Sequence, residues 1–155
     1  MEGIGWENSE IATGSTILIR PNQTTPDADG NTVYADKRVR QALAMAVDNS
    51  ICLELGYANK GAPADNHHAG SMHPEHDPSV GRLPYDPAKA KALMAEAGMA
   101  DYEHELISID DDWRKNTTDA VAAQLRDAGI KVKRTILPGS TFWNDWAKYP
   151  FSSTN

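Results

Sequence analysis

Several features that would place this chain in a common class are scarce or absent. Cys52 is the only cysteine, so an internal disulfide is excluded and the redox compartment stays undetermined. No apolar run approaches the ~20 residues that a membrane-spanning helix needs, and residues 1–5 lack the basic and apolar regions of a signal peptide. With 15 Lys and Arg against 22 Asp and Glu, the net charge is -7, so we expect neither nucleic acid nor an anionic membrane as a partner.

Motifs of catalysis are also missing. The sequence contains no Gly-rich phosphate loop, no serine elbow and no Cys–His nucleophile context. Asp110, Asp111 and Asp112 form a run of carboxylates, but three acids in front of a helix are explained by their interaction with the helix N-terminus and by solvation. We therefore expect binding rather than an enzyme, and no cofactor.

The sequence predicts two helices with clear capping residues. Asp36 precedes one apolar stripe, and Asp86 with Pro87 precedes a second, which Gly98 ends. The apolar positions recur at helical spacing. They are Val39, Ala42, Leu43, Ala46 and Val47 in the first helix and Ala90, Leu93, Met94 and Ala97 in the second.

The chain between these two helices contains a short helix and then a long loop. Asp48–Ser50 interrupts the first stripe, and residues 51–55 resume it as a helix that we expect Gly56 to close. Residues 57–85 show no period, and a structureless connection of this length in a compact domain is usually functional or disordered. Four of the five histidines fall within residues 67–76.

The remaining pattern predicts an α/β fold. Residues 17–20 suit a strand that Pro21 stops, and residues 106–109 suit another. A helical stripe from 114 to 128 and an alternating run from 130 to 136 follow. A strand, helix and strand with a crossover of this length predict a parallel pair.

A last short helix is predicted over residues 141–148. Ser140 would cap it, Phe142 and Trp146 would lie on its buried side, and Trp143 lies one position round the helix.

Three segments together resemble one protein family. They are DKRVRQALAMAVDNS (residues 36–50), YDPAKAKALMAEAG (residues 85–98) and AVAAQLRDAGIKVK (residues 120–133). In this order and at these separations they resemble the extracellular solute-binding proteins of ABC importers, in the group that carries peptides, oligopeptides and nickel. The resemblance extends from about Ile11 to the end of the chain.

The resemblance implies a partial lobe of a two-lobed periplasmic-binding-protein fold, with a mixed sheet flanked by helices. Residues 1–155 would be a single α/β domain, a fragment of the C-terminal lobe, with residues 1–12 as a linker or edge segment and residues 57–85 as a long cleft loop. The implied partners are a small peptide or other polar solute and an ABC permease in the membrane. The implied location is the periplasm or the extracellular surface.

The resemblance also implies ligand-binding residues, each with a structural alternative. Asn22 stands where the family's strand ends at the cleft, although an Asn there also closes turns. Asn66, His67 and His68 occupy the early part of the cleft loop, where they either bind a polar ligand or brace the loop itself. Trp143 would reach the cleft from the last helix.

Three further hypotheses stay open. A small metal-binding module could use the His67–His76 loop, although its spacing matches no helical zinc motif and Pro74 precludes a regular helix there. A stand-alone enzyme could use the same histidines as acid and base. Unpaired sheet edges in a partial lobe would favour a homodimer.

Overall fold

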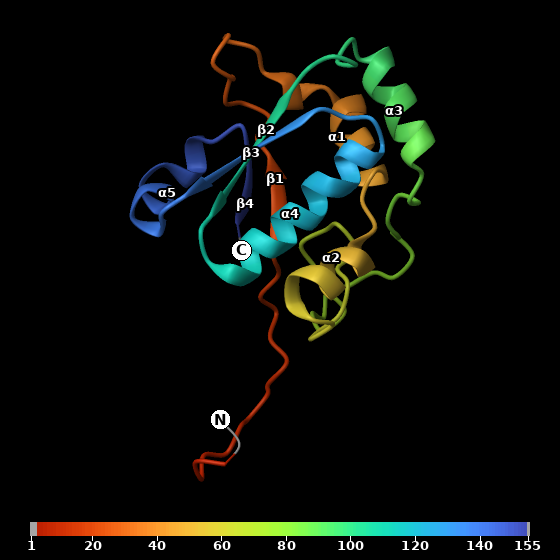
Figure 1. Cartoon of the computed structure of the whole chain (residues 1–155). Coiled ribbons are helices and arrows are strands. Elements are labelled where there is room, and N and C mark those ends of the chain that lie inside the picture. Colours follow the sequence, from red (N-terminus) through yellow and green to blue (C-terminus); the bar gives the residue numbers. More distant parts are fainter. Residues whose placement is uncertain (1–2, 155) are drawn as a thin grey trace.

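A four-stranded mixed sheet lies at the centre of the computed structural model, which describes residues 3–154 (Figure 1). The strand order is β1-β4-β2-β3. Strand β2 is parallel to β3 and β4, and β1 is antiparallel to β4. The predicted α/β class and the predicted parallel pair are confirmed. The strands are β1 (Leu18–Pro21), β2 (His104–Ile109), β3 (Val132–Leu137) and β4 (Phe151–Thr154).

Helices cover both faces of the sheet. Helix α4 and, beyond it, α1, α2 and α3 lie on one side, and α5 lies on the other (Figure 1). The helices are α1 (Lys37–Met45), α2 (Asn49–Tyr57), α3 (Pro87–Glu96), α4 (Asp112–Asp127) and α5 (Gly139–Asp145), with 3-10 turns η1 (Val33–Ala35) and η2 (Trp146–Lys148). Within residues 3–154, no helix has the length and apolar character that crossing a membrane requires.

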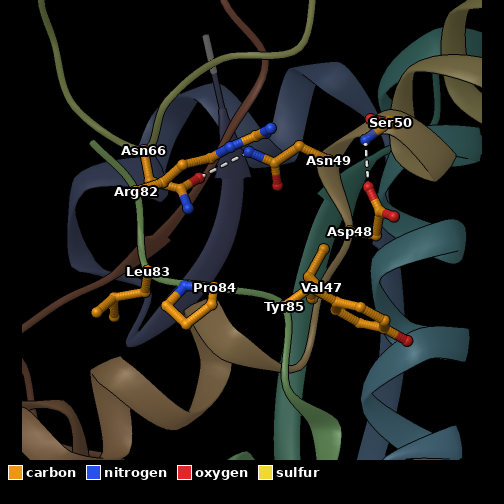
Figure 2. A pocket seen from close by; sticks show the side chains of 9 residues that line it. All are labelled: Val47, Asp48, Asn49, Ser50, Asn66, Arg82, Leu83, Pro84 and Tyr85. Carbon is orange, nitrogen blue, oxygen red and sulfur yellow. Dashed lines mark hydrogen bonds between the residues drawn. The ribbon is translucent and has the colours of Figure 1, made fainter. Parts of the chain in front are cut away.

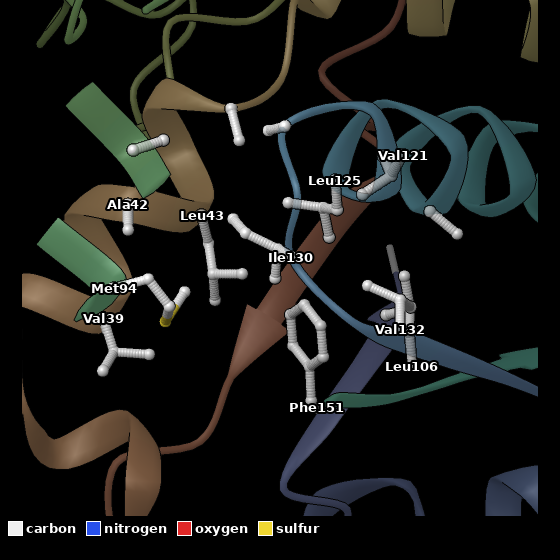
Figure 3. Close-up of a cluster of buried hydrophobic side chains, with 14 of the residues drawn as sticks. Val39, Ala42, Leu43, Met94, Leu106, Val121, Leu125, Ile130, Val132 and Phe151 are labelled. Atoms are coloured by element: carbon white, nitrogen blue, oxygen red, sulfur yellow. The ribbon is translucent and has the colours of Figure 1, made fainter. Parts of the chain in front are cut away.

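The main core fills the space between the sheet and the helices on the α4 side (Figure 3). It includes Val39, Leu43, Met94, Leu106, Leu125, Ile130, Val132 and Phe151. On the opposite face, Ile107 and Ile109 of β2 pack against the buried Phe142 of α5. Since Leu106 and Ile107 belong to different clusters, β2 is buried on both faces, as expected of a strand between two parallel neighbours.

The predicted caps of α1 and α3 are present. The Asp36 carboxylate accepts the Arg38 amide at 2.8 Å, and the Asp86 carboxylate accepts the Lys89 amide at 2.9 Å. Asp48 caps α2 by accepting the Ser50 amide at 2.9 Å. These bonds satisfy amides that have no partner within their own helix.

Several predicted boundaries are wrong, each because a contact from another element overrides the local signal. Pro21 is the last residue of β1 rather than the first residue after it, which it can be because β1 pairs only with β4 and is an edge strand. Gly56 does not end α2, which continues to Tyr57, with Ala58 taking the left-handed conformation at φ 50°. Gly56 is instead buried against Thr117 of α4.

The last segment also differs from the prediction. Helix α5 begins at Gly139, with Pro138 rather than Ser140 at the N-cap position. Trp146 lies in the 3-10 turn η2 with 37% of its surface exposed, so its predicted burial is wrong. Strand β4 was not predicted. Residues 3–12 are exposed and contain no helix or strand, whereas Met1, Glu2 and Asn155 lie outside the described residues.

Candidate functional site

The loop between α2 and α3 is held to the start of α2 by one side chain. The Asn49 side-chain amide donates to the Ala64 carbonyl at 2.7 Å and to Oδ1 of Asn66 at 2.9 Å. Asn66 adopts a left-handed backbone conformation, with φ 64°, which Asn tolerates better than most residues. The loop therefore turns sharply at Asn66.

Two hollows of about 320 Å³ each lie on either side of this turn and share Asn66, Arg82 and Leu83. Figure 2 shows the first hollow, in which the Asn49–Asn66 bond spans one side and Leu83, Pro84 and Tyr85 form the other. Its remaining lining residues are Val47, Asp48 and Ser50. The second hollow lies between the loop and α1. Its remaining lining residues are Lys37, Arg40, Gln41, Ala44, Asp65, His67, Val80 and Gly81.

The second hollow carries more positive than negative charge. Its lining includes three basic side chains, Lys37, Arg40 and Arg82, against the single carboxylate of Asp65. Arg82 lies 3.9 Å from Asp65, and Arg40 donates to the Tyr34 and Ala35 carbonyls at 2.9 Å each. This arrangement suits a solute with carboxylate or carbonyl groups more than a cation of comparable size.

The histidines of the loop divide into three environments. The His67 and His76 rings are stacked with their centroids 5.5 Å apart, and His76 Nδ1 lies 3.0 Å from the Ala69 carbonyl. His73 Nδ1 accepts the Gly70 amide at 2.9 Å and so braces a turn. His68 is exposed.

Asp77 adds a carboxylate beside two of these histidines. Hydrogen bonds from Ser79 hold the pKa of Asp77 below its usual range, and the charges of His76 and His67 lower it further. Asp77 is therefore ionised at neutral pH.

A second group of side chains lies where β2 ends and α4 begins. Arg114 pairs with the Asp111 carboxylate, and its guanidinium lies 4.0 Å from the ring centre of Trp113 and 5.5 Å from that of Trp143. The Tyr57 ring lies 6.2 Å from that of Trp113. In open α/β sheets, ligands bind outside the carboxyl ends of the strands, which is where this group lies.

Sequence reasoning did not select Tyr57, Trp113 or Arg114. The sequence does carry a signal, because Trp113 and Arg114 follow directly after the acidic run at the end of a strand. That acidic run is interpreted above only through its interaction with the helix N-terminus and with solvent. Trp143 was selected, and with 42% of its surface exposed it can contact a solute or another protein surface.

The five predicted ligand residues do not form one cluster. Asn66 and His67 line the same hollow, and His68 follows them with its side chain exposed. Trp143 lies apart, beside Arg114.

Asn22 lies at the other end of the sheet, where its amide nitrogen donates to the Pro150 carbonyl just before β4. Its Oδ1 accepts hydrogen bonds from the Thr24 amide, the Thr24 hydroxyl and the Thr25 amide, each at 3.1 Å. Its Nδ2 donates to the Ala147 carbonyl at 3.1 Å. Both polar atoms of the side chain are therefore engaged in closing a turn.

Comparison with known families and proteins gives consistent matches. The family described as bacterial extracellular solute-binding proteins, family 5 Middle, matches residues 2–155. Di/tripeptide-binding protein 2 of Pseudomonas aeruginosa is 36% identical over 88 residues, which are 55% of this chain and 16% of that protein. Heme-binding protein A of Haemophilus influenzae is 30% identical over 121 residues, which are 74% of this chain and 21% of that protein.

A solved structure agrees with these matches. Listeria monocytogenes OppA bound to peptide superimposes with a TM-score of 0.70 and 26% identity, covering 90% of this chain and 30% of that one. The chain thus spans about a fifth or less of the two curated relatives and under a third of the solved structure.

Proposed function

Because this chain belongs to the bacterial extracellular solute-binding proteins of family 5, we propose that it forms part of a component that captures peptides or similar small polar solutes for an ABC importer. The family match over residues 2–155 is the observation that carries this proposal. Identity of 36% to a di/tripeptide-binding protein and of 26% to a peptide-bound structure supports peptides as the solute class. These comparisons do not favour a small metal-binding module as the function of the chain.

In the whole protein, this α/β unit would belong to one of two lobes that close on the solute. Closure by a hinge excludes water and presents a distinct, closed form to a membrane permease. The work of such a protein is binding and release, so no catalytic step is assigned to the chain. Its place would be the periplasm or the outer cell surface.

The contacts with solute would come from two parts of one wall. Asn66, His67 and His68 offer hydrogen bonds beside the positively charged second hollow, where Arg82 can pair with a peptide carboxylate. Trp113 and Trp143, which both lie against Arg114, offer aromatic surface at the carboxyl end of β2, and Tyr57 lies beside Trp113. Asn22 is left out because its side chain is already engaged in a turn.

Binding to one wall alone should be weak, because half of the contacts and the exclusion of water are missing. We expect a Kd on the order of millimolar or weaker for di- and tripeptides with this chain. Nuclear magnetic resonance detects binding in this range through shifts of backbone amide signals, which also locate the site.

The test is a titration of the labelled chain with di- and tripeptides. The expected result is a set of shifts confined to residues 64–68, 82–85 and the surroundings of Trp143, with the amides near Asn22 as an internal control. Asn66→Ala should weaken the shifts, and Asn59→Ala, a change at another left-handed Asn of the same region, should leave them unchanged. Shifts centred on the Asn22 turn, or none at high millimolar peptide, would overturn the assignment of this wall.

A further inference from the structure

The three side chains of Asp65, His67 and His76 converge on one point of the loop between α2 and α3. Each offers a ligand atom, and these atoms all lie within 4.8 Å of one another. All three side chains are half-buried, and the loop that carries them passes beside α2 in Figure 1. Asp65 and His67 lie two residues apart, and His76 follows nine residues after His67 in the same loop.

We propose that Asp65, His67 and His76 bind a divalent transition-metal ion of the zinc class. Two imidazoles and one carboxylate are the ligands that Zn²⁺ and its neighbours take in proteins, whereas Mg²⁺ and Ca²⁺ prefer oxygen alone. With metal–ligand bonds of ~2.1 Å, tetrahedral ligands lie about 3.4 Å apart, so the widest pair of ligand atoms in this group needs to close by up to ~1.4 Å.

The second observation is that a backbone carbonyl fixes the tautomer of His76. A carbonyl oxygen only accepts hydrogen bonds, so His76 Nδ1, 3.0 Å from the Ala69 carbonyl, carries the proton and donates it. In the neutral ring the lone pair then lies on Nε2. A backbone carbonyl in this position is how metal-binding histidines in proteins are usually held in one tautomer and one orientation.

Backbone hydrogen bonds hold the loop around the ligands in shape. The His73 amide donates to the Gly70 carbonyl at 2.9 Å, and the His76 amide donates to the His73 carbonyl at 3.0 Å. His73 itself is excluded as a ligand through Nδ1, because that atom accepts the Gly70 amide. The geometry thus selects two histidines out of the four in the loop.

Two carboxylates near the site oppose the positive charge that Lys37, Arg40 and Arg82 bring to the adjoining second hollow. Asp65 contributes one carboxylate, and Asp77 follows His76 directly with a second. Arg82 competes for Asp65, but the two groups lie 3.9 Å apart with about two fifths of each side chain exposed, so their ion pair is weak.

Three protein ligands leave at least one coordination position for water or a solute atom. Asp65 and His67 also line the second hollow, so that position would face the space proposed for the solute. The ion site is nevertheless independent of the importer function, because it is defined by this chain alone and is tested with metal alone.

The test is calorimetric titration of the untagged chain with Zn²⁺, with Mg²⁺ as the comparison ion. We expect one Zn²⁺ per chain with a Kd on the order of 10 μM or tighter, and no heat from Mg²⁺. His67→Ala, His76→Ala and Asp65→Asn should each weaken Zn²⁺ binding ~30-fold or more, since even the loss of a residue that only orients a ligand costs ~10–100-fold. His68→Ala, in the same loop and exposed, is the matched control and should change the Kd less than ~3-fold.

A second measurement uses the unmodified chain and so does not depend on the folding of a variant. Proton–nitrogen correlation spectra of the imidazoles should show Zn²⁺ shifting the ring nitrogens of His67 and His76 and leaving those of His68 and His73 in place. Binding that survives His76→Ala, binding lost equally in His68→Ala, or no Zn²⁺ binding to the unmodified chain would overturn the site.

Discussion

The side-chain amide of Asn49 lies 2.9 Å from Oδ1 of Asn66, and this hydrogen bond joins the first turn of α2 to the loop that carries the histidines. The same amide donates to the Ala64 carbonyl, so one side chain holds both Ala64 and Asn66 of the loop in place. Because Asn66 lines both hollows, the shape of the proposed solute wall depends on this contact.

Two substitutions of Asn66 should distinguish the stability that comes from its hydrogen bond from the cost of its left-handed backbone conformation. Asn66→Ala removes the acceptor for Asn49 and leaves a Cβ residue at φ 64°, so we expect a loss of about 2 kcal/mol in the free energy of unfolding. Asn66→Gly removes the same acceptor without the conformational penalty and should be about 1 kcal/mol more stable than Asn66→Ala. Urea unfolding measures both, and equal stabilities of the two variants would contradict a strained turn.

Gly56→Ala should strongly destabilise the contact between α2 and α4. A Cβ at position 56 would lie 2.0 Å from Oγ1 and 2.8 Å from Cα of Thr117, and the second of these atoms is backbone. We expect a loss of about 3 kcal/mol or more. The control is Gly98→Ala, where φ is 74° but nothing lies within 4 Å, so the loss should stay near 1 kcal/mol. Thermal unfolding of the two variants side by side compares them, and similar losses would show that α2 and α4 are not in close contact.

His104 should make stability depend on pH. Burial in the sheet lowers the pKa of His104 from 6.5 to about 4, while Tyr34 Oη lies 2.9 Å from its Nδ1. The unfolded chain therefore takes up a proton as the pH falls through 6.5, whereas the folded chain does so only near 4. This contribution to stability is present above pH 6.5 and is lost progressively as the pH falls toward 4, by about 3 kcal/mol in all.

His104→Gln keeps a polar partner for the Tyr34 hydroxyl but does not titrate in this range. Its unfolding free energy should fall less steeply than that of the unmodified chain between pH 6.5 and 4, when urea unfolding is measured across that window. His68→Gln, at an exposed histidine, should keep the steeper dependence. Parallel pH profiles for the His104→Gln variant and the unmodified chain would show that His104 is not buried in its neutral form.

Arg134 should matter more for stability than its neighbour Lys133. With a side chain only 10% exposed, Arg134 donates to the Leu106 carbonyl at 2.7 Å, the Ser108 hydroxyl at 2.8 Å and Asp119 at 2.9 Å. Arg134→Ala should cost about 3 kcal/mol, and Arg134→Lys should recover only part of this, because an ammonium cannot reproduce the planar fork. Lys133→Ala removes an exposed pair and should stay within about 0.5 kcal/mol. Chemical denaturation measures the stability of all three variants. An Arg134→Ala variant as stable as the unmodified chain would refute a stabilising role of the Arg134 hydrogen bonds.

The sheet edges should promote self-association. In the described part of the chain, β1 pairs only with β4 and β3 pairs only with β2, so one side of each carries backbone groups with no strand partner. We predict dimers at high concentration, measured by light scattering. Ile136→Lys places a charge at an exposed position of β3 and should reduce the dimer fraction. A strict monomer at every concentration would exclude pairing through these edges.

The candidate site was predictable only in part. The family resemblance selected Asn66 and His67, which do line one hollow, and Trp143, which is exposed beside Arg114. It also selected Asn22, whose side chain closes a turn. The positions of Tyr57 and Arg82 could not be predicted, because each side chain lies against a residue distant in the chain, Trp113 and Asp65 respectively.

Local chemistry in the sequence was enough to define the helices that Asp36, Asp48 and Asp86 begin, because a capping bond joins residues only two or three positions apart. The α/β class followed in the same way from periodicity within single segments. Only the tertiary structure decided that Gly56 meets Thr117, that His104 is buried and that Asp65 and His67 face His76. Each of these features depends on packing between different elements or between different turns of a long loop. No local sequence pattern specifies which residues meet in such a contact.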